Sequence, residues 1–158
     1  MEKENKSELT KEIESYVSHF GNDRSALLPI LQAIQKKYSY ISSYAQQEVA
    51  RLLDIHPVEV FGVISFYSFL SSEPKGEYII RLCKTIICDI SGKAEVEKAI
   101  ENATKTNFGE TSKDKKFTLE YTNCLGMCDM GPAMMVNDKI YTKLTPEKVN
   151  EIISNLNN

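Results

Sequence analysis

Apolar residues in the first half of the chain recur at three- and four-residue intervals, the spacing that gives a helix one buried face. This pattern predicts a helix from about Leu9 to Phe20 that Gly21 ends, and a second helix that Ser25 caps. Two more helices are expected at about 43–53 and, beginning at a proline, at 57–67. We expect the four apolar faces to meet in the core of a small helical bundle.

The pattern changes at residues 71–76, Ser-Ser-Glu-Pro-Lys-Gly, a polar stretch rich in turn-forming residues. Beyond it, alternating apolar and polar positions predict strands at 77–82 and 117–121, with helical spacing between them. We therefore expect a domain boundary in this stretch, with a helical bundle at 1–74 and a second domain at 75–158.

The second domain is predicted to follow the order β-α-β-β-β-α. Its first two strands are joined by a helix, so they are expected to be parallel with a right-handed crossover. Polar, lysine-rich residues 102–116 predict a solvated loop, Asn137-Asp138 predicts a tight hairpin, and Pro146 lies at the start of a final helix. The predicted fold class is thus α+β, an N-terminal helical bundle followed by a thioredoxin-like α/β domain.

All four cysteines of the chain fall in the second domain, as two pairs. Cys83 and Cys88 enclose four residues, and Cys124 and Cys128 enclose three. The first cysteine of each pair stands where a predicted strand ends. Because the carboxyl ends of neighbouring parallel strands share one edge of a sheet, four thiolates are expected to converge there.

Four thiolates complete the tetrahedral shells of two bridged irons, so a [2Fe–2S] cluster fits this pattern. The formal charge of such an oxidised centre is about −2, which backbone N–H groups of the two loops would stabilise. Gly126 and Gly131 suit loops whose backbone approaches a ligand closely.

A structural Cys₄ zinc site is the main alternative, since zinc also takes four thiolates. Zinc ribbons favour two-residue spacers, and neither pair has one. Two disulfides would need an oxidising compartment, and a dithiol enzyme would need Cys-x-x-Cys at a helix start.

Other chemistry-bearing residues have structural explanations. His56 precedes Pro57 in the other domain and is expected to be a cap or surface residue rather than a ligand. Four methionines near the second pair are expected to pack rather than bind metal: Met127, Met130, Met134 and Met135. The aromatic stretch 61–69 is expected to be mostly core, with a docking face as the alternative.

Composition narrows the classes of partner. A formal net charge of −3, without a dominant basic face, argues against nucleic acid. No stretch approaches the roughly 18 uninterrupted apolar residues of a membrane span, and residues 1–6 show no export or transit pattern. We expect a soluble cytoplasmic chain that reaches a membrane only through a partner. Without a Walker loop, a Gly-x-Gly-x-x-Gly motif or a Ser/His/Asp set, it is expected to have no active site of its own.

Taken together, these residues resemble the thioredoxin-like [2Fe–2S] ferredoxin subunit of NADH-linked complexes. That family includes the smallest peripheral subunit of the NADH-oxidising module of respiratory complex I. It also includes the matching subunit of multimeric flavin-dependent hydrogenases, some of them electron-bifurcating, and of NAD-linked formate dehydrogenases. The resemblance covers nearly the whole chain, and its carriers are Val-Phe-Gly-Val-Ile-Ser-Phe-Tyr at 60–67, Cys83-x₄-Cys88, and Cys124-Leu125-Gly126-Met127-Cys128 followed by Gly131-Pro132.

The resemblance implies one [2Fe–2S] cluster, for which Cys83, Cys88, Cys124 and Cys128 would be both the metal ligands and the cofactor-binding residues. It also implies a larger iron–sulfur partner subunit that binds FMN and NAD(H), and a further catalytic subunit. The parent complex stays open, as does the alternative of a zinc-stabilised interaction module without a redox role. The loop 84–87 departs from the family, because it lacks the small, glycine-containing sequence usual there.

Overall fold

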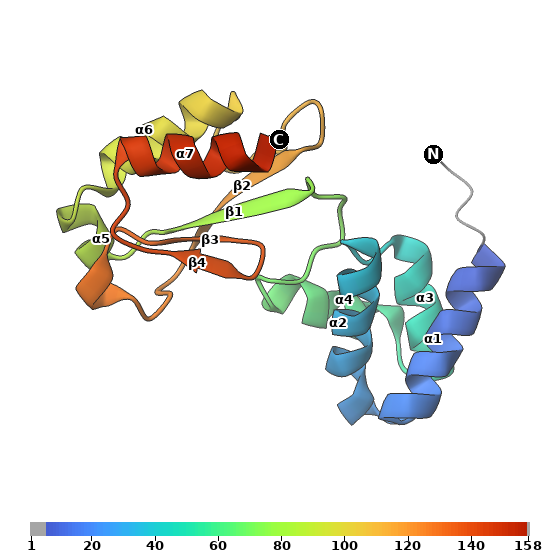
Figure 1. The fold of residues 1–158 in the computed structure, drawn as a ribbon. Helices are drawn as coiled ribbons and strands as arrows, with labels where there is room; N and C mark the ends of the chain where they lie inside the picture. The colour runs from blue at the N-terminus through green and yellow to red at the C-terminus, as the bar shows by residue number, and fades with distance from the viewer. Residues whose placement is uncertain (1–5, 158) are drawn as a thin grey trace. The chain divides into compact units, whose positions relative to one another are not determined.

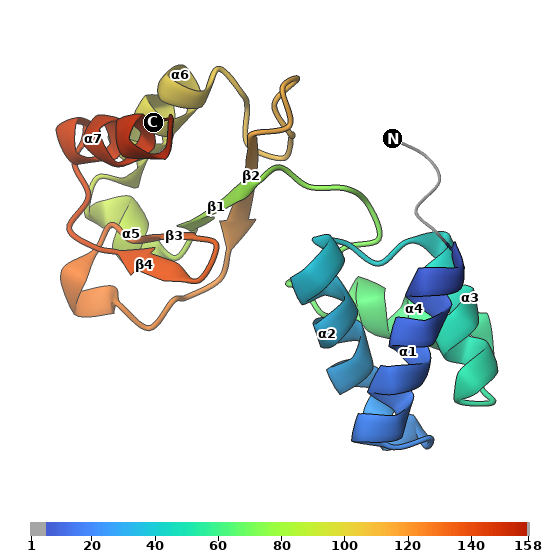
Figure 2. The same ribbon diagram turned by 45° about the vertical axis from the view of Figure 1, so that its right-hand side comes forward.

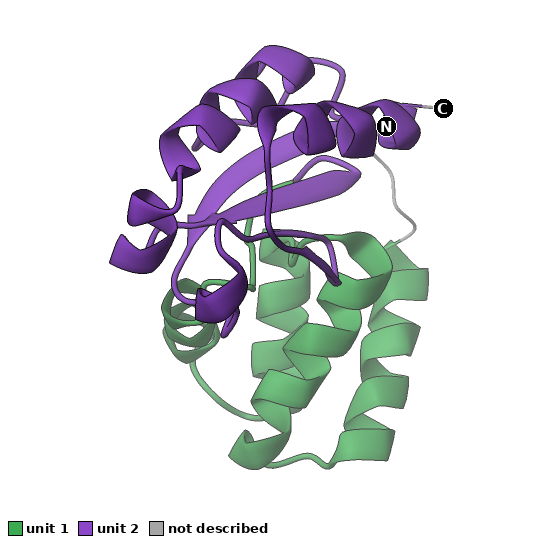
Figure 3. Ribbon diagram, turned by 60° about the vertical axis from the view of Figure 1, so that its left-hand side comes forward, with its two compact units in different colours: residues 1–74 green, residues 75–158 purple. Residues whose placement is uncertain are grey.

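The computed structural model describes residues 6–157 and divides the chain into two compact units, Met1–Pro74 and Lys75–Asn158 (Figure 3). The first unit is helical and the second combines helices with a four-stranded sheet, which confirms the predicted α+β class. None of the described helices has the length and apolar character that crossing a membrane requires. Residues 1–5, on which most of the expectation about export signals depends, lie outside the described part of the chain.

The helices of the first unit follow one another along the chain (Figure 1). They are α1 (Lys6–Phe20), the 3₁₀ turn η1 (Arg24–Ala26), α2 (Leu27–Tyr38), α3 (Ser43–Leu52) and α4 (Pro57–Phe66). Gly21 ends α1 as predicted: it adopts a positive φ of 111°, and its N–H donates to the carbonyl of Val17 at 2.9 Å.

The predicted cap of the second helix was wrong. Ser25 lies inside η1, and the carboxylate of Asp23 accepts the N–H of Ser25 at 2.7 Å. An aspartate readily accepts the N–H two residues further on, so the chain first forms a tight turn there. As a consequence α2 begins two residues later than Ser25, at Leu27.

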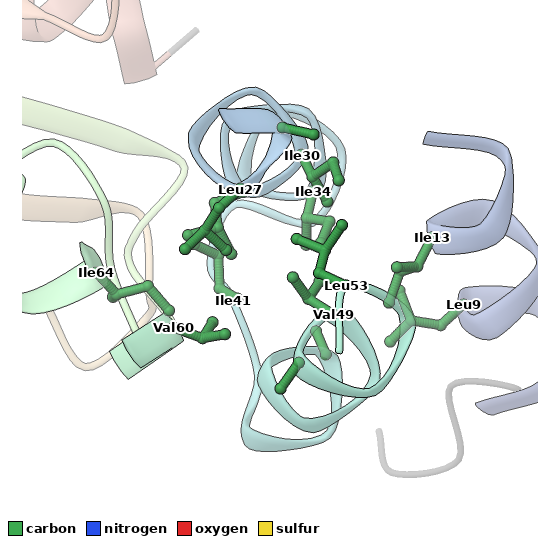
Figure 4. Packing of buried hydrophobic residues seen from close by; sticks show 14 residues of the cluster. Leu9, Ile13, Leu27, Ile30, Ile34, Ile41, Val49, Leu53, Val60 and Ile64 are labelled. Carbon is green, nitrogen blue, oxygen red and sulfur yellow. The ribbon is translucent and has the colours of Figure 1, made fainter. Parts of the chain in front are cut away.

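The core of the first unit forms where apolar stripes from all four helices meet (Figure 4). Its labelled side chains point toward one another from different helices, among them Ile13 of α1, Ile34 of α2, Val49 of α3 and Val60 of α4. Each of these is at most 1% exposed. Burial of one such side chain contributes about 1.5–3 kcal/mol, so this core gives the helical unit its own source of stability.

The second unit follows the predicted order with one addition. Its elements are β1 (Tyr78–Cys83), α5 (Ile86–Ile90), α6 (Lys93–Thr104), β2 (Phe117–Thr122), the 3₁₀ turn η2 (Cys128–Met130), β3 (Met134–Val136), β4 (Lys139–Tyr141) and α7 (Pro146–Asn157). The short helix α5 was not predicted, and α6 continues further into the segment that was expected to be a loop.

The sheet has the order β2-β1-β3-β4. The β1 and β2 strands pair in parallel, as predicted, while β3 pairs antiparallel with both β1 and β4. Helices α6 and α7 lie side by side over one face of the sheet (Figure 2). The core of the second unit lies between these helices and the sheet. It contains, from the strands, Ile80, Leu82, Leu119 and Met134, and from the helices, Val96, Ile100, Val149 and Ile153.

An ion-pair network joins β1 and β2 on the opposite face of the sheet. Arg81 and Glu120 are register partners, and their Nε and Oε2 atoms lie 3.0 Å apart. The Nζ atom of Lys75 lies 2.9 Å from the other carboxylate oxygen of Glu120. Arg81 is buried, and it lies two residues before Cys83, the last residue of β1. This network therefore fixes the relative position of two strands near the ends that lead to the cysteine pairs.

Gly76 offers a test of how closely the second unit is packed at the start of β1. A Cβ atom there would lie 2.7 Å from the backbone carbonyl carbon of Phe117. The backbone must therefore shift in the variant Gly76→Ala. We expect this substitution to lower the free energy of unfolding by about 1–3 kcal/mol. Gly62→Ala is the matched control, because Gly62 lies on the exposed side of α4 and a Cβ atom there would meet nothing within 4 Å. This variant should be stabilised by about 0.5–1 kcal/mol. Urea denaturation of both variants measures this, and equal effects would contradict the packing described.

Candidate metal centre

The two cysteine pairs leave the sheet at the same edge. Cys83 is the last residue of β1 and is in register with Thr122, the last residue of β2. Cys88 lies in α5, Cys124 follows β2 after one further residue, and Cys128 begins η2. Figure 1 shows α5 and the η2 segment at the same end of the sheet. The structure thus brings the two predicted pairs to one place because β1 and β2 are parallel neighbours.

The first pair is shielded from solvent. Cys83 and Cys88 are each 2% exposed, and the Oγ1 atom of Thr85 lies 3.3 Å from the sulfur of Cys83. Burial raises the pKa of the Cys83 thiol, but the hydroxyl and N–H of Thr85 oppose it, so the pKa falls below its usual value. Burial and the neighbouring sulfur of Cys83 raise the pKa of Cys88. The pair therefore favours one thiolate and resists a second unless a cation compensates it.

The second pair is exposed. The sulfurs of Cys124 and Cys128 lie 3.3 Å apart, which is too far for a disulfide, and all four cysteines of the chain are free. The N–H of Gly126, a residue with a positive φ of 78°, donates to the sulfur of Cys124 at 3.3 Å. The neighbouring sulfur of Cys124 raises the pKa of Cys128, chiefly through their hydrogen bond and mutual repulsion as thiolates.

The pairs are close enough to act on one another. Cys83 and Cys88 add to the increase in the pKa of Cys128. The backbone N–H of Leu125, from the loop of the second pair, helps to lower the pKa of Cys83. Among residues 6–157, however, no three His, Cys, Asp or Glu side chains are gathered closely enough to hold one metal ion. The site thus offers two neighbouring pairs of sulfurs rather than one compact shell of four.

A glycine lies next to the first pair. A Cβ atom at Gly131 would lie 3.7 Å from the sulfur of Cys88 and 3.3 Å from the hydroxyl oxygen of Ser91. A side chain at this position would therefore contact both Cys88 and Ser91. Four thiols, the N–H donor of Gly126 and the hydroxyl of Thr85 fit a sulfur-ligated cluster with negative charge.

The side chains that were predicted to be structural separate into two groups. His56 lies at the N-cap position of α4 and is exposed, as predicted. Of the four methionines, Met134 lies in the core of the second unit, whereas Met127, Met130 and Met135 are half-buried. The prediction that the aromatic stretch 61–69 is mostly core was wrong. Val60 and Ile64 form the buried face of α4, while the aromatic side chains are exposed, from 43% for Tyr67 to 80% for Phe66.

Thr85 was missed as a functional residue. Thr85 stands two residues after Cys83 and directly before α5. Because this short helix was not predicted, the position of the hydroxyl could not be recognised from the sequence. Three exposed isoleucines of α5, Ile86, Ile87 and Ile90, add an apolar rim beside Cys88.

Comparison with known proteins points to one family. The family model described as thioredoxin-like [2Fe-2S] ferredoxin matches residues 11–157. An NADH-quinone oxidoreductase subunit from Buchnera aphidicola (subspecies Acyrthosiphon pisum) is 38% identical over 152 residues, 94% of each chain. The protein of the same name from Escherichia coli K12 is 35% identical over 141 residues, 89% of this chain and 85% of that one.

A second kind of relative is a larger protein. NAD-reducing hydrogenase HoxS subunit alpha of Cupriavidus necator is 32% identical over 148 residues, which are 94% of this chain but 25% of that protein. Among solved structures, an air-oxidised NAD⁺-reducing [NiFe]-hydrogenase matches with a TM-score of 0.71 at 22% identity, over 80% of this chain and 22% of that chain. This structural match shows a shared fold.

The difference in exposure between the pairs predicts an order of thiol reactivity. In the folded, metal-free, reduced chain, iodoacetamide should modify Cys124 and Cys128 well before Cys83 and Cys88, because the second pair is exposed and the first is buried. Peptide mass spectrometry over a time course measures the four rates. In guanidinium chloride all four should react at similar rates, which is the control. Equal rates in the folded chain would contradict the site geometry.

Proposed function

The chain belongs to the thioredoxin-like [2Fe-2S] ferredoxin family, and we propose that it is an electron-transfer subunit that holds one [2Fe–2S] cluster. The proposed ligands are the four cysteines: Cys83, Cys88, Cys124 and Cys128. The observation that carries this proposal is the convergence of two thiol pairs at one edge of the sheet, with two sulfurs available to each of two irons.

When bound, the cluster supplies one-electron transfer without a proton. The residues of the chain supply the environment. Burial of Cys83 and Cys88 excludes water from one side, while the exposed pair leaves the other side open to a redox partner. The N–H of Gly126 and the hydroxyl of Thr85 contact ligand sulfurs and stabilise negative charge on them. We assign this function to the unit at 75–158, because all four thiols lie there.

The zinc alternative is less well supported. Zinc ribbons favour two-residue spacers between paired cysteines, and these pairs enclose four and three residues. The second function, an interaction module without a redox role, therefore has no particular observation in its favour.

We further propose that the chain works with larger subunits. The relatives from Buchnera aphidicola and Escherichia coli are, by name, parts of NADH-quinone oxidoreductases. The hydrogenase relative contains a region like this chain within a protein about four times as long (25% of its length). A region that matches part of a longer relative is expected to work beside a protein region that corresponds to the rest of that relative. We infer that this partner is the flavin- and NAD(H)-binding iron–sulfur subunit, in a complex with a further catalytic subunit.

The parent complex in this proposal is an NADH dehydrogenase module or an NAD-dependent hydrogenase, including an electron-bifurcating one. In either case the chain itself would not oxidise NADH, and it would work in the cytoplasm or at a membrane surface through its partner.

The helical unit offers a surface for this partner. We define the aromatic segment as Phe61, Phe66, Tyr67 and Phe69, all more than 40% exposed. The rings of Phe66 and Tyr67 contact one another edge to face, with their centroids 5.1 Å apart. Exposed aromatic side chains in this number are typical of protein interfaces, in which a few of them contribute most of the binding energy. We propose that the aromatic segment contacts the larger flavoprotein subunit.

Metal analysis tests the proposed cofactor. The anaerobically purified chain should contain about two irons and two acid-labile sulfides, and Cys124→Ala or Cys128→Ala should lose nearly all of the visible absorption. Met127→Leu, between these two cysteines, is the control and should keep it. The helical circular dichroism of the cysteine variants should largely persist, because the core of the first unit contains no cysteine. One zinc per chain and no sulfide, after reconstitution with iron and sulfide, would refute the proposal.

Co-purification tests the proposed partner. From the native organism, the chain should copurify with a flavoprotein that reduces dye with NADH, whereas the chain alone should be inactive.

A pair of variants tests the contact surface. Phe66→Ser should weaken the complex at least about tenfold, as expected for an aromatic residue central to an interface. Phe20→Ser, at a 41% exposed phenylalanine at the end of α1, should not. Equal weakening by both substitutions would argue against the aromatic segment as the contact, and dye reduction by the isolated chain would refute the assignment of the NADH site to a partner.

A further inference from the structure

The hydroxyl of Thr85 is directed at a ligand sulfur rather than at the helix that Thr85 precedes. Thr85 occupies the N-cap position of α5, with extended backbone angles of −78° and 158°. A threonine in that position ordinarily accepts a hydrogen bond from the first turn of its helix. Here the side chain makes no such bond, and its Oγ1 atom lies 3.3 Å from the sulfur of Cys83. The usual role of the hydroxyl is thus replaced by a contact with sulfur.

The direction of this hydrogen bond follows from the chemistry of the ligand. A cysteine that binds iron does so as a thiolate, which has no proton to donate. The Thr85 hydroxyl must therefore be the donor and the Cys83 sulfur the acceptor. Because Cys83 is 2% exposed, water does not compete well for the sulfur, and a hydrogen bond to a charged acceptor in such surroundings is stronger than one in solvent.

We propose, on the basis of the function proposed above, that Thr85 is a positioning residue whose hydroxyl raises the reduction potential of the centre by donating to Cys83. On reduction, an external donor supplies one electron, one ferric ion becomes ferrous, and no proton moves. The formal charge of the centre then changes from about −2 to about −3. A donor to a ligand sulfur stabilises the more negative state more, so its presence favours reduction.

Two features of the site agree with this role. The hydroxyl contacts the buried pair, in which Cys83 and Cys88 are each 2% exposed, so solvent screens its hydrogen bond to the sulfur very little. In addition, Thr85 lies between the two cysteines in sequence and just before the helix that carries Cys88. Only proline would remove a backbone donor such as the N–H of Gly126, and the φ of 78° at that residue does not suit proline. The Thr85 hydroxyl, in contrast, can be replaced by a methyl group of similar size.

The test is a redox titration of the reconstituted full-length chain with dithionite, followed by electron paramagnetic resonance. Thr85→Val removes the donor and keeps the shape, and Thr85→Ser keeps the donor. We expect a several-fold lower ratio of reduced to oxidised cluster at fixed potential for Thr85→Val, and a ratio close to wild type for Thr85→Ser. Thr85→Ala, which also lacks the hydroxyl but adds no bulk, should shift in the same direction as Thr85→Val and replaces it if that variant assembles poorly.

Ser91→Ala is the matched control. Ser91 follows α5, and its hydroxyl donates to the carbonyl of Ile87 at 2.7 Å instead of to a sulfur. Its loss should leave the midpoint potential unchanged. An unchanged or higher midpoint in the hydroxyl-free variants, or an equal shift in Ser91→Ala, would overturn the proposed role of Thr85. A wild-type chain without iron and sulfide would instead refute the proposed function, so the two failures are distinguishable.

Discussion

The parallel pairing of β1 with β2 is the constraint on which the rest of the second unit depends. Residues Cys83 and Thr122 stand in register at the ends of these strands, so the loops that follow leave the sheet from one edge. The Arg81–Glu120 ion pair and the core beneath α6 and α7 hold the strands in this register. A slip of one residue would turn Leu82 out of the core and separate the thiol pairs, so the stability of the sheet and the geometry of the site are linked.

Electrostatics explains why the site has its particular donors. Four thiolates in close proximity repel one another. Burial and then the neighbouring sulfur of Cys83 raise the pKa of Cys88, and the neighbouring sulfur of Cys124 raises the pKa of Cys128. The chain reduces the cost with N–H groups and the Thr85 hydroxyl, and bound cations would remove the rest. Metal binding and the folding of the two loops are therefore expected to be coupled, while the helical unit, with its separate core, is not part of this balance.

Much of the fold could be predicted because its periodicities are long and regular. The helices of the first unit, the parallel strands and the final helix all have clear apolar stripes, and the cysteine spacing could be recognised directly. The short helix α5 could not, since five residues are too few to show a period and three of them are isoleucines, which also suit strands. The exposure of Phe66 was missed because α4 is apolar on almost every side, so spacing alone does not show which face is buried. Thr85 depends on the course of the backbone between Cys83 and Cys88, which sequence patterns do not specify.

The central claim is that four sulfurs hold two bridged irons, and X-ray absorption at the iron edge tests it most directly. In the chain purified without oxygen, the account predicts that each iron is surrounded by sulfur alone and has a second iron as a close neighbour. A nitrogen or oxygen ligand to iron, iron without a metal neighbour, or a zinc ion within four sulfurs in its place would contradict it.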